Sequence, residues 1–161
     1  MVSPHYYWWN MAYGIFVLQI LSYLSVIPML MYASWHHYII AYFLYFLFGG
    51  LGMIVGYHRL HSHRSFHVPL WFEKLITIFA TMSLTGPAID WVAIHRAHHK
   101  WHDTPKDPHS PEHKGRLKVH FLTMFAKVSP KFAMDLIRTP FYMWKRKYYF
   151  YIIAAVSYTH L

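Results

Sequence analysis

The chain has 161 residues and a net charge of +9, with 56% hydrophobic residues and only 13% charged ones. It contains no cysteine, which excludes disulfides, thiolate-bound zinc, iron–sulfur clusters and cysteine nucleophiles. A coiled-coil, collagen-like or disordered chain is excluded too, because 20% of the residues are aromatic and no heptad or triplet repeat occurs. The length fits one domain.

Residues 1–57 hold no Lys, Arg, Asp or Glu, and two apolar runs fill this stretch. The runs cover residues 11–32 and 38–57, and each has the length of about 20 residues that crosses a hydrocarbon core. The short linker 33–37 would join them as an antiparallel hairpin. A signal peptide is excluded, because no basic residue precedes the first run and a second run follows. We therefore expect an all-α membrane protein that begins with a transmembrane hairpin.

All 15 Lys and Arg residues follow the second run, which predicts that residues 58–147 lie on the cytoplasmic side. The excess of basic residues is then explained by the orientation of the chain in the membrane and by contact with the lipid surface. Nucleic-acid binding is disfavoured, because no RNA- or DNA-binding motif is present. Residues 70–84 are predicted to lie at the membrane interface or to re-enter the membrane without spanning it. Residues 119–137 are predicted to form an amphipathic surface helix that Pro130 interrupts. Residues 148–161 would start a further transmembrane helix.

The chain has 15 histidines, which concentrate after the second apolar run. His95, His98 and His99 have the spacing that places three side chains on one face of a helix. His58 and His63 are five residues apart, about 140° around an α-helix, so they could reach one ion only from a helix end or a bend. Clustered neutral imidazoles suit a transition metal.

These imidazoles outnumber the ligands of one structural zinc, so two metal ions in a shared cage fit better. Iron with open coordination positions can activate dioxygen. No H-E-x-x-H motif, phosphate-binding loop or Ser–His–Asp pattern is present, which disfavours a zinc protease or hydrolase. His61 falls between two better-placed histidines and is predicted to support the ligands without binding metal itself.

At this point the sequence resembles a known family. GYHRLHSHRSF (56–66) and WVAIHRAHHKWHDTPKDPHSP (91–111) look like the membrane fatty acyl desaturases of the acyl-CoA desaturase type. The resemblance implies a non-haem di-iron centre whose ligands are His58, His63, His95, His98 and His99. It also implies supporting roles for Asp107 and His109 in the D-P-H loop, and an acyl-chain tunnel lined in part by Trp91.

The implied reaction uses dioxygen and two electrons to remove two hydrogens from a saturated acyl chain, leaving a cis double bond and water. The basic face would steer an acidic electron donor, such as cytochrome b5 or a ferredoxin. Three alternatives remain open: a related membrane di-iron hydroxylase of lipids, alkanes or carotenoids, a non-enzymatic membrane metal-binding protein, and an inert truncated fragment.

Two positions depart from the family pattern. Animal members carry Arg-Asp before the second histidine box and use it to hold CoA, whereas this chain has Ala93-Ile94; an acyl-CoA, an acyl-ACP and a lipid-bound acyl chain are all open as substrates. The family's third histidine box follows another pair of spans, yet only His160 follows His120, so we expect a chain cut before that box. Residues 156–161 can also be read from the codons of a sequencing-library adapter.

Overall fold

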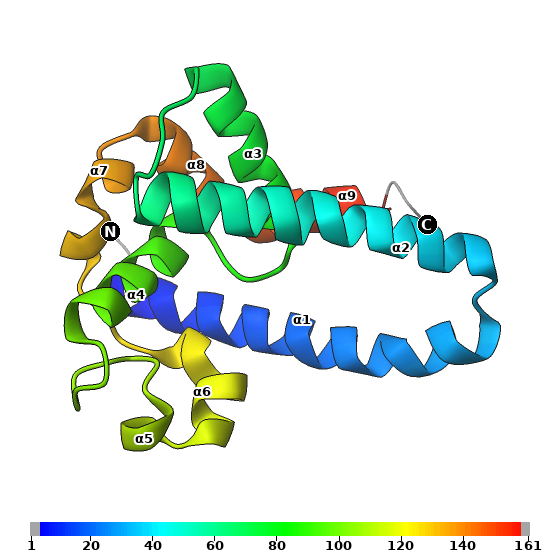
Figure 1. The fold of residues 1–161 in the computed structure, drawn as a ribbon, viewed down its shortest axis with the longest axis horizontal. Helices are drawn as coiled ribbons and strands as arrows, with labels where there is room; N and C mark the ends of the chain where they lie inside the picture. The colour runs from blue at the N-terminus through cyan, green and yellow to red at the C-terminus, as the bar shows by residue number, and fades with distance from the viewer. Residues whose placement is uncertain (1–3, 159–161) are drawn as a thin grey trace.

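The structure, a computed structural model, describes the backbone of residues 4–158 and the side chains of residues 11–156. His160 and the last residues of the suspected adapter segment lie outside the described part. Helix α1 (Pro4–Tyr32) is followed by α2 (Trp35–Tyr45), which continues without interruption into a π-helix, η1 (Phe46–Ser62). Helices α1 and α2 run in opposite directions and are joined at one end of the molecule (Figure 1). The described chain contains no strand.

Both long helices are apolar enough to cross a membrane, over Met11–Tyr32 and Trp35–Ser62. Only 6% and 11% of their most apolar windows are buried, so they are not core helices of a soluble domain. The hairpin predicted from the sequence is therefore present as two exposed apolar helices. The second helix extends beyond the expected end at residue 57, so His58 and His61 belong to its last turns.

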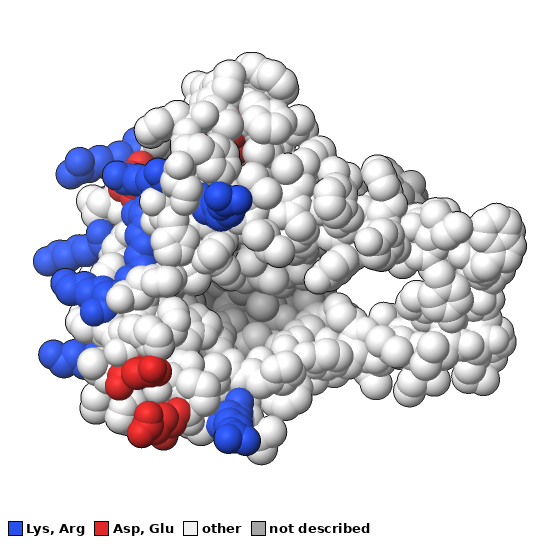
Figure 2. All heavy atoms as spheres, viewed as in Figure 1, with Lys and Arg blue, Asp and Glu red and all other residues white. Residues whose placement is uncertain are grey.

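The other elements lie mostly at the end of the hairpin away from the turn, with α9 drawn nearer its middle (Figure 1). They are α3 (Leu70–Met82), α4 (Ala88–Trp101), α5 (Pro111–Lys114), α6 (Arg116–Leu122), η2 (Thr123–Phe125), η3 (Pro130–Ala133), α7 (Met134–Ile137), α8 (Pro140–Lys147) and α9 (Tyr149–Tyr158). Their core includes the buried residues Tyr57, Ala80, Val92 and Leu136. Figure 2 shows the charged side chains gathered at this same end, while the turn of the hairpin carries none.

Two glycines bring α3 against η1. A Cβ added at Gly52 would lie 2.4 Å from the backbone nitrogen of Ala80, and one added at Gly56 would lie 2.4 Å from Ile76 Cγ2. Side chains at these positions would therefore separate the two helices. The opposite face of α3 leaves its large apolar side chains exposed, namely Leu70, Trp71, Leu75 and Ile78.

The segment 119–137 is interrupted at Pro130, as its sequence predicts, and the part before Pro130 is also broken. Its first part belongs to α6 and η2, and a non-helical stretch then leads to Ser129. The Ser129 hydroxyl accepts a hydrogen bond from the Lys131 N–H, and Pro130 takes the first position of η3. Proline has no N–H with which to continue a helix, so it begins a new one here.

Candidate metal centre

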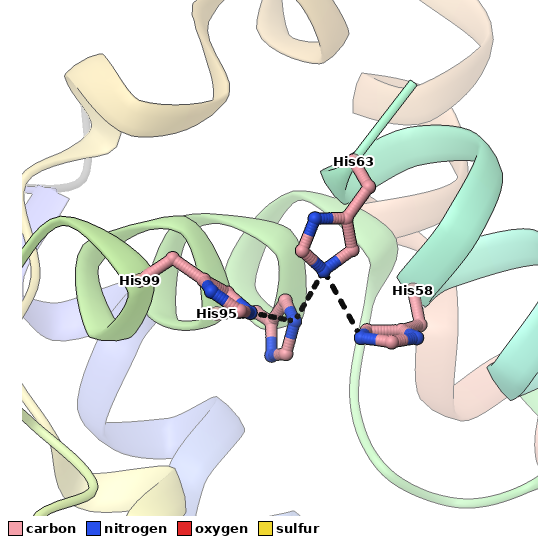
Figure 3. A group of neighbouring side chains, drawn as sticks. All are labelled: His58, His63, His95 and His99. Carbon is pink, nitrogen blue, oxygen red and sulfur yellow. Dashed lines mark hydrogen bonds between the residues drawn. The ribbon is translucent and has the colours of Figure 1, made fainter. Parts of the chain in front are cut away.

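Four histidines bring their Nε2 atoms to one point, two from the end of η1 and two from α4 (Figure 3). His63 Nε2 lies 3.0 Å from His58 Nε2 and 3.3 Å from His95 Nε2, and His95 Nε2 lies 3.0 Å from His99 Nε2. All four of these ligand atoms lie within 4.8 Å of one another. His63 and His99 are exposed and the other two are partly buried.

The π-helix explains why His58 and His63 meet. In an α-helix these positions would point apart, but a π-helix closes its turn from residue i to residue i+5. The His63 N–H accordingly bonds to the His58 carbonyl at 3.0 Å. The two imidazoles thus lie one turn apart on the same side, with ring centroids 4.5 Å apart. The sequence predicts a helix end or a bend here; the helix does end at His63, and its last turn is a π-helical turn.

The four-histidine group fits a transition metal ion. With a metal–nitrogen bond of about 2.1 Å, ligand nitrogens in adjacent positions lie about 3.0–3.4 Å apart, as the bridging contacts do here. Metal binding also requires neutral imidazoles. Burial, together with the neighbouring histidines, lowers the pKa of His95 to about 3, and the same two causes lower the pKa of His99. The lowered pKa values of His95 and His99 thus favour the neutral form that a metal ligand needs.

His98 does not join this group, although it lies on the same helix. It belongs to a second set of potential metal ligands with His102 and Asp107. Its Nδ1 lies 2.9 Å and 3.0 Å from the two carboxylate oxygens of Asp107. A carboxylate can only accept, so the ring donates through Nδ1 and keeps the Nε2 lone pair for a metal. From the sequence, His102 begins the histidine-containing loop that ends in Asp107-Pro108-His109, but its role as a ligand stays open, although its spacing of four from His98 is the spacing of one helix face.

Asp107 is fully buried and joins its loop to α4. Besides His98, it accepts hydrogen bonds from the backbone N–H of Asp103 at 3.0 Å and of His109 at 2.8 Å. Burial alone would raise the pKa of Asp107, but the hydrogen bonds from His109, His98 and Asp103 outweigh it and lower the pKa. The carboxylate is thus ionised and holds the His98 ring in one tautomer.

The other predicted site residues lie around the two groups. His61 is buried and bonds through Nε2 to the Thr77 hydroxyl at 2.8 Å, outside the four-histidine group. The His109 ring lies 5.4 Å from the ring of His98. Trp91 stacks on His95, with centroids 4.7 Å apart and planes within 15°.

A cavity of about 370 Å³ opens next to Trp91. It runs between α1 and the start of α4, and its walls include Ile15, Leu84, Trp91 and Ile94. His109 also reaches its wall, so the cavity passes close to the histidine groups. Its size and mostly apolar lining suit an apolar ligand.

An apolar helical hairpin with histidine groups able to bind metal at one end defines a class of membrane-type metalloproteins. The family profile "Fatty acid desaturase" matches residues 33–160, which covers most of the chain and all the histidines above. The chain belongs to the fatty acid desaturase family.

Curated relatives agree with this assignment. The chain is 38% identical over 130 residues to the sn-1 stearoyl-lipid 9-desaturase of Anabaena variabilis, covering 77% of this chain and 47% of the relative. It is 38% identical over 158 residues to the sn-2 palmitoyl-lipid 9-desaturase of Nostoc sp. (strain 36), covering 91% and 53%. It is 50% identical over 70 residues to Delta-9 acyl-lipid desaturase 2 of Arabidopsis thaliana, covering 44% and 23%. The chain thus spans about half the length of the first two relatives.

Proposed function

We propose that the protein containing this chain is an oxygen-dependent acyl desaturase with a histidine-bound di-iron centre. The observation that carries this proposal is the convergence of four Nε2 atoms from two helices, beside a separate group built on His98. His58, His63, His95 and His99 would hold one iron, and His98 would contribute to the second. Asp107 would orient His98, while His61 and His109 would support the surrounding packing.

The proposed acyl chain lies in the cavity beside Trp91. When bound, the irons would supply the activation of dioxygen. Overall, one saturated –CH₂–CH₂– unit, O₂, two electrons and two protons give a cis –CH=CH– unit and two waters. The protein's own part is to bind the acyl chain along Ile15 and Leu84, to position it with Trp91 and to exclude water.

A lipid-bound acyl chain is the substrate that fits best. Ala93 and Ile94, which replace the CoA-holding pair of animal members, are only 1% and 8% exposed. Neither side chain can reach a charged carrier in solution. The relatives from Anabaena, Nostoc and Arabidopsis are also named for acyl lipids. A hydroxylase of the same class would use the same centre but leave an alcohol.

We further propose that the hairpin spans the membrane, over residues 11–32 and 38–57, as part of one desaturase domain. Residues 58–147, with the histidine groups, would then face the cytoplasm, and 148–161 would begin a further span. The basic end in Figure 2 would receive an acidic electron donor such as cytochrome b5 or a ferredoxin. Donor-driven turnover should then fall steeply as salt rises, whereas salt-insensitive turnover would count against this docking.

The test is to express the complete protein that contains this chain in a host that lacks the product double bond, and to analyse the host lipids by gas chromatography–mass spectrometry. Wild type should produce a cis-monounsaturated chain, while His95→Ala should yield none and retain less iron. His67→Ala removes an exposed histidine outside both groups and should leave product and iron unchanged. An alcohol product would identify a hydroxylase, and iron-loaded wild type without any product would refute the enzymatic proposal.

A further inference from the structure

Arg96 lies on α4 between the metal-binding histidines, and it reaches across to the end of η1. Its guanidinium donates to the carbonyls of His61 and Ser62, the latter at 3.3 Å, and to the Phe132 carbonyl at 2.7 Å. The last carbonyls of a helix have no partner inside it. Arg96 therefore satisfies the end of the helix that carries His58 and joins it to α4.

Asp135 holds this arginine in place. Its two carboxylate oxygens accept from Arg96 Nη1 at 2.8 Å and Nη2 at 2.9 Å, and Oδ2 also accepts from Arg64 Nη2 at 2.7 Å. Arg96 and Asp135 thus form a bidentate pair, which fixes the orientation of the guanidinium as well as its distance. Burial would raise the pKa of Asp135, but hydrogen bonds from Arg96 and Arg64 outweigh it and hold the pKa well below its usual range.

Arg64 follows His63 directly, at the turn that leaves η1. Its φ is +52°, a left-handed conformation that is uncommon for a residue other than glycine and needs support from its surroundings. His63 itself is exposed, so packing does little to fix its ring. Yet its Nε2 is the atom that contacts both His58 and His95. The position of the His63 ring between His58 and His95 therefore depends on the backbone turn at Arg64.

The backbone around Asp135 is held in place by buried neighbours. Asp135 lies in the short helix α7, between Ala133 and Leu136, which are 0% and 4% exposed. Both pack in the same core cluster as Val92 and Ala93 of α4. Asp135 is therefore placed by packing against the helix that supplies His95 and His99.

We propose that Asp135 is a positioning residue of the metal centre, whose carboxylate holds Arg64 and Arg96 and so keeps His63 opposite His95. It touches no metal ligand and acts only through the two arginines. The proposal rests on the four-histidine site proposed above. It adds to that site a carboxylate that lies 72 residues beyond His63 in the chain and belongs to neither histidine box.

The test is a Co²⁺ titration of the metal-free chain in detergent, because the visible absorption of Co²⁺ reports the arrangement of its imidazole ligands. Asp135→Asn should weaken Co²⁺ binding by about 10–100-fold, the usual effect of losing a supporting residue, and change the band shape. Asp135→Glu keeps the charge and should recover part of the affinity. Glu112→Gln neutralises an exposed carboxyl elsewhere and should leave both readouts unchanged.

Each outcome decides a different point. A wild-type Co²⁺ band that Asp135→Asn leaves unchanged overturns the positioning role and leaves the metal site standing. A wild type without any imidazole-type band overturns the metal site and this proposal with it. If circular dichroism shows that Asp135→Asn does not fold, Arg64→Gln decides, because it keeps the Arg96–Asp135 pair. A weaker and altered Co²⁺ band in that variant supports the proposal, and an unchanged one overturns it.

Discussion

His95 and His98 lie one turn apart on α4, but their side chains face different partners. His95 joins the four-histidine group, while His98 is held by Asp107 in the second group. The pattern H-x-x-H-H places three imidazoles on one side of a helix, and it does not say which of them share an ion. That division depends on the residues opposite the helix, which are His58 and His63 on one side and the D-P-H loop on the other.

This division predicts different losses for two substitutions. His95→Ala removes the imidazole in contact with both His63 and His99, so it should abolish Co²⁺ binding at the four-histidine group. His98→Ala should leave that band in place and lower only the total iron content. Visible absorption and metal analysis of the two purified variants measure this. Identical losses in both would mean that the five histidines form one inseparable site.

Lys145 is a second residue whose surroundings cannot be predicted from the sequence. Its side chain is 1% exposed, and its ammonium donates to the Tyr57 hydroxyl at 2.9 Å, the Thr77 carbonyl at 2.6 Å and the Thr81 hydroxyl. Burial lowers the pKa of Lys145 to about 7, from 10.5. The cation thus joins α8 to η1 and α3, at the cost of losing its water shell.

The lowered pKa predicts a pH dependence of stability. Between pH 7 and 10.5 the unfolded chain binds a proton at Lys145 that the folded chain has released, so the free energy of unfolding should rise with pH in this window. Lys145→Met should flatten the rise. Melting temperatures at pH 7 and pH 9 would measure it, with Lys147→Met, an exposed lysine on the same helix, as the control. An equal rise in wild type and Lys145→Met would contradict the assignment.

At the scale of elements, the packing of α3 on η1 depends on two of the four glycines in the second apolar helix. Gly52 and Gly56 lie against α3, whereas a Cβ at Gly49 would meet only Tyr45 of its own helix, at 3.4 Å. Glycines spaced along an apolar helix predict a close helix neighbour. They do not identify the neighbour or the glycines it uses.

Alanine substitutions at Gly52 and Gly49 would distinguish a glycine in contact with α3 from one that is not. Gly52→Ala places a methyl 2.4 Å from the Ala80 backbone, so α3 must move, and we expect a loss of about 1–3 kcal/mol, as for other overpacked sites. Gly49→Ala meets no such obstacle and should be neutral or stabilising by up to about 1 kcal/mol. Thermal unfolding of both variants in detergent compares them. A Gly52→Ala protein as stable as Gly49→Ala would show that the helices are not in close contact.

At the scale of the whole molecule, charge is segregated along the long axis. The first 57 residues contain no Lys, Arg, Asp or Glu, and the charged side chains gather at the end of the histidine groups (Figure 2). Such a distribution suits a chain whose one end is in water and whose other end is in lipid. If the hairpin spans a membrane, the exposed apolar face of α3 would rest on the lipid surface, as residues 70–84 are predicted to do.

The lack of native cysteine makes this topology easy to test. A single cysteine at Ala33, in the turn of the hairpin, should react with a membrane-impermeant maleimide from the non-cytoplasmic side only. A cysteine at Glu112, in α5, should react only after the cytoplasmic face is opened. Labelling of both positions from the same side would contradict a spanning hairpin.

The sequence by itself determined the apolar hairpin, the all-helical class, the family and the histidines that could bind metal. These follow from local composition and short spacings, which one helix or one motif displays on its own. Only the tertiary structure decided that η1 is a π-helix, that His98 bonds to Asp107 apart from the other four histidines, and that Asp135 bonds to both Arg64 and Arg96. The contact of His63 with His95 joins residues 32 apart and that of Arg64 with Asp135 joins residues 71 apart, and contacts over such distances leave no periodic pattern in the sequence.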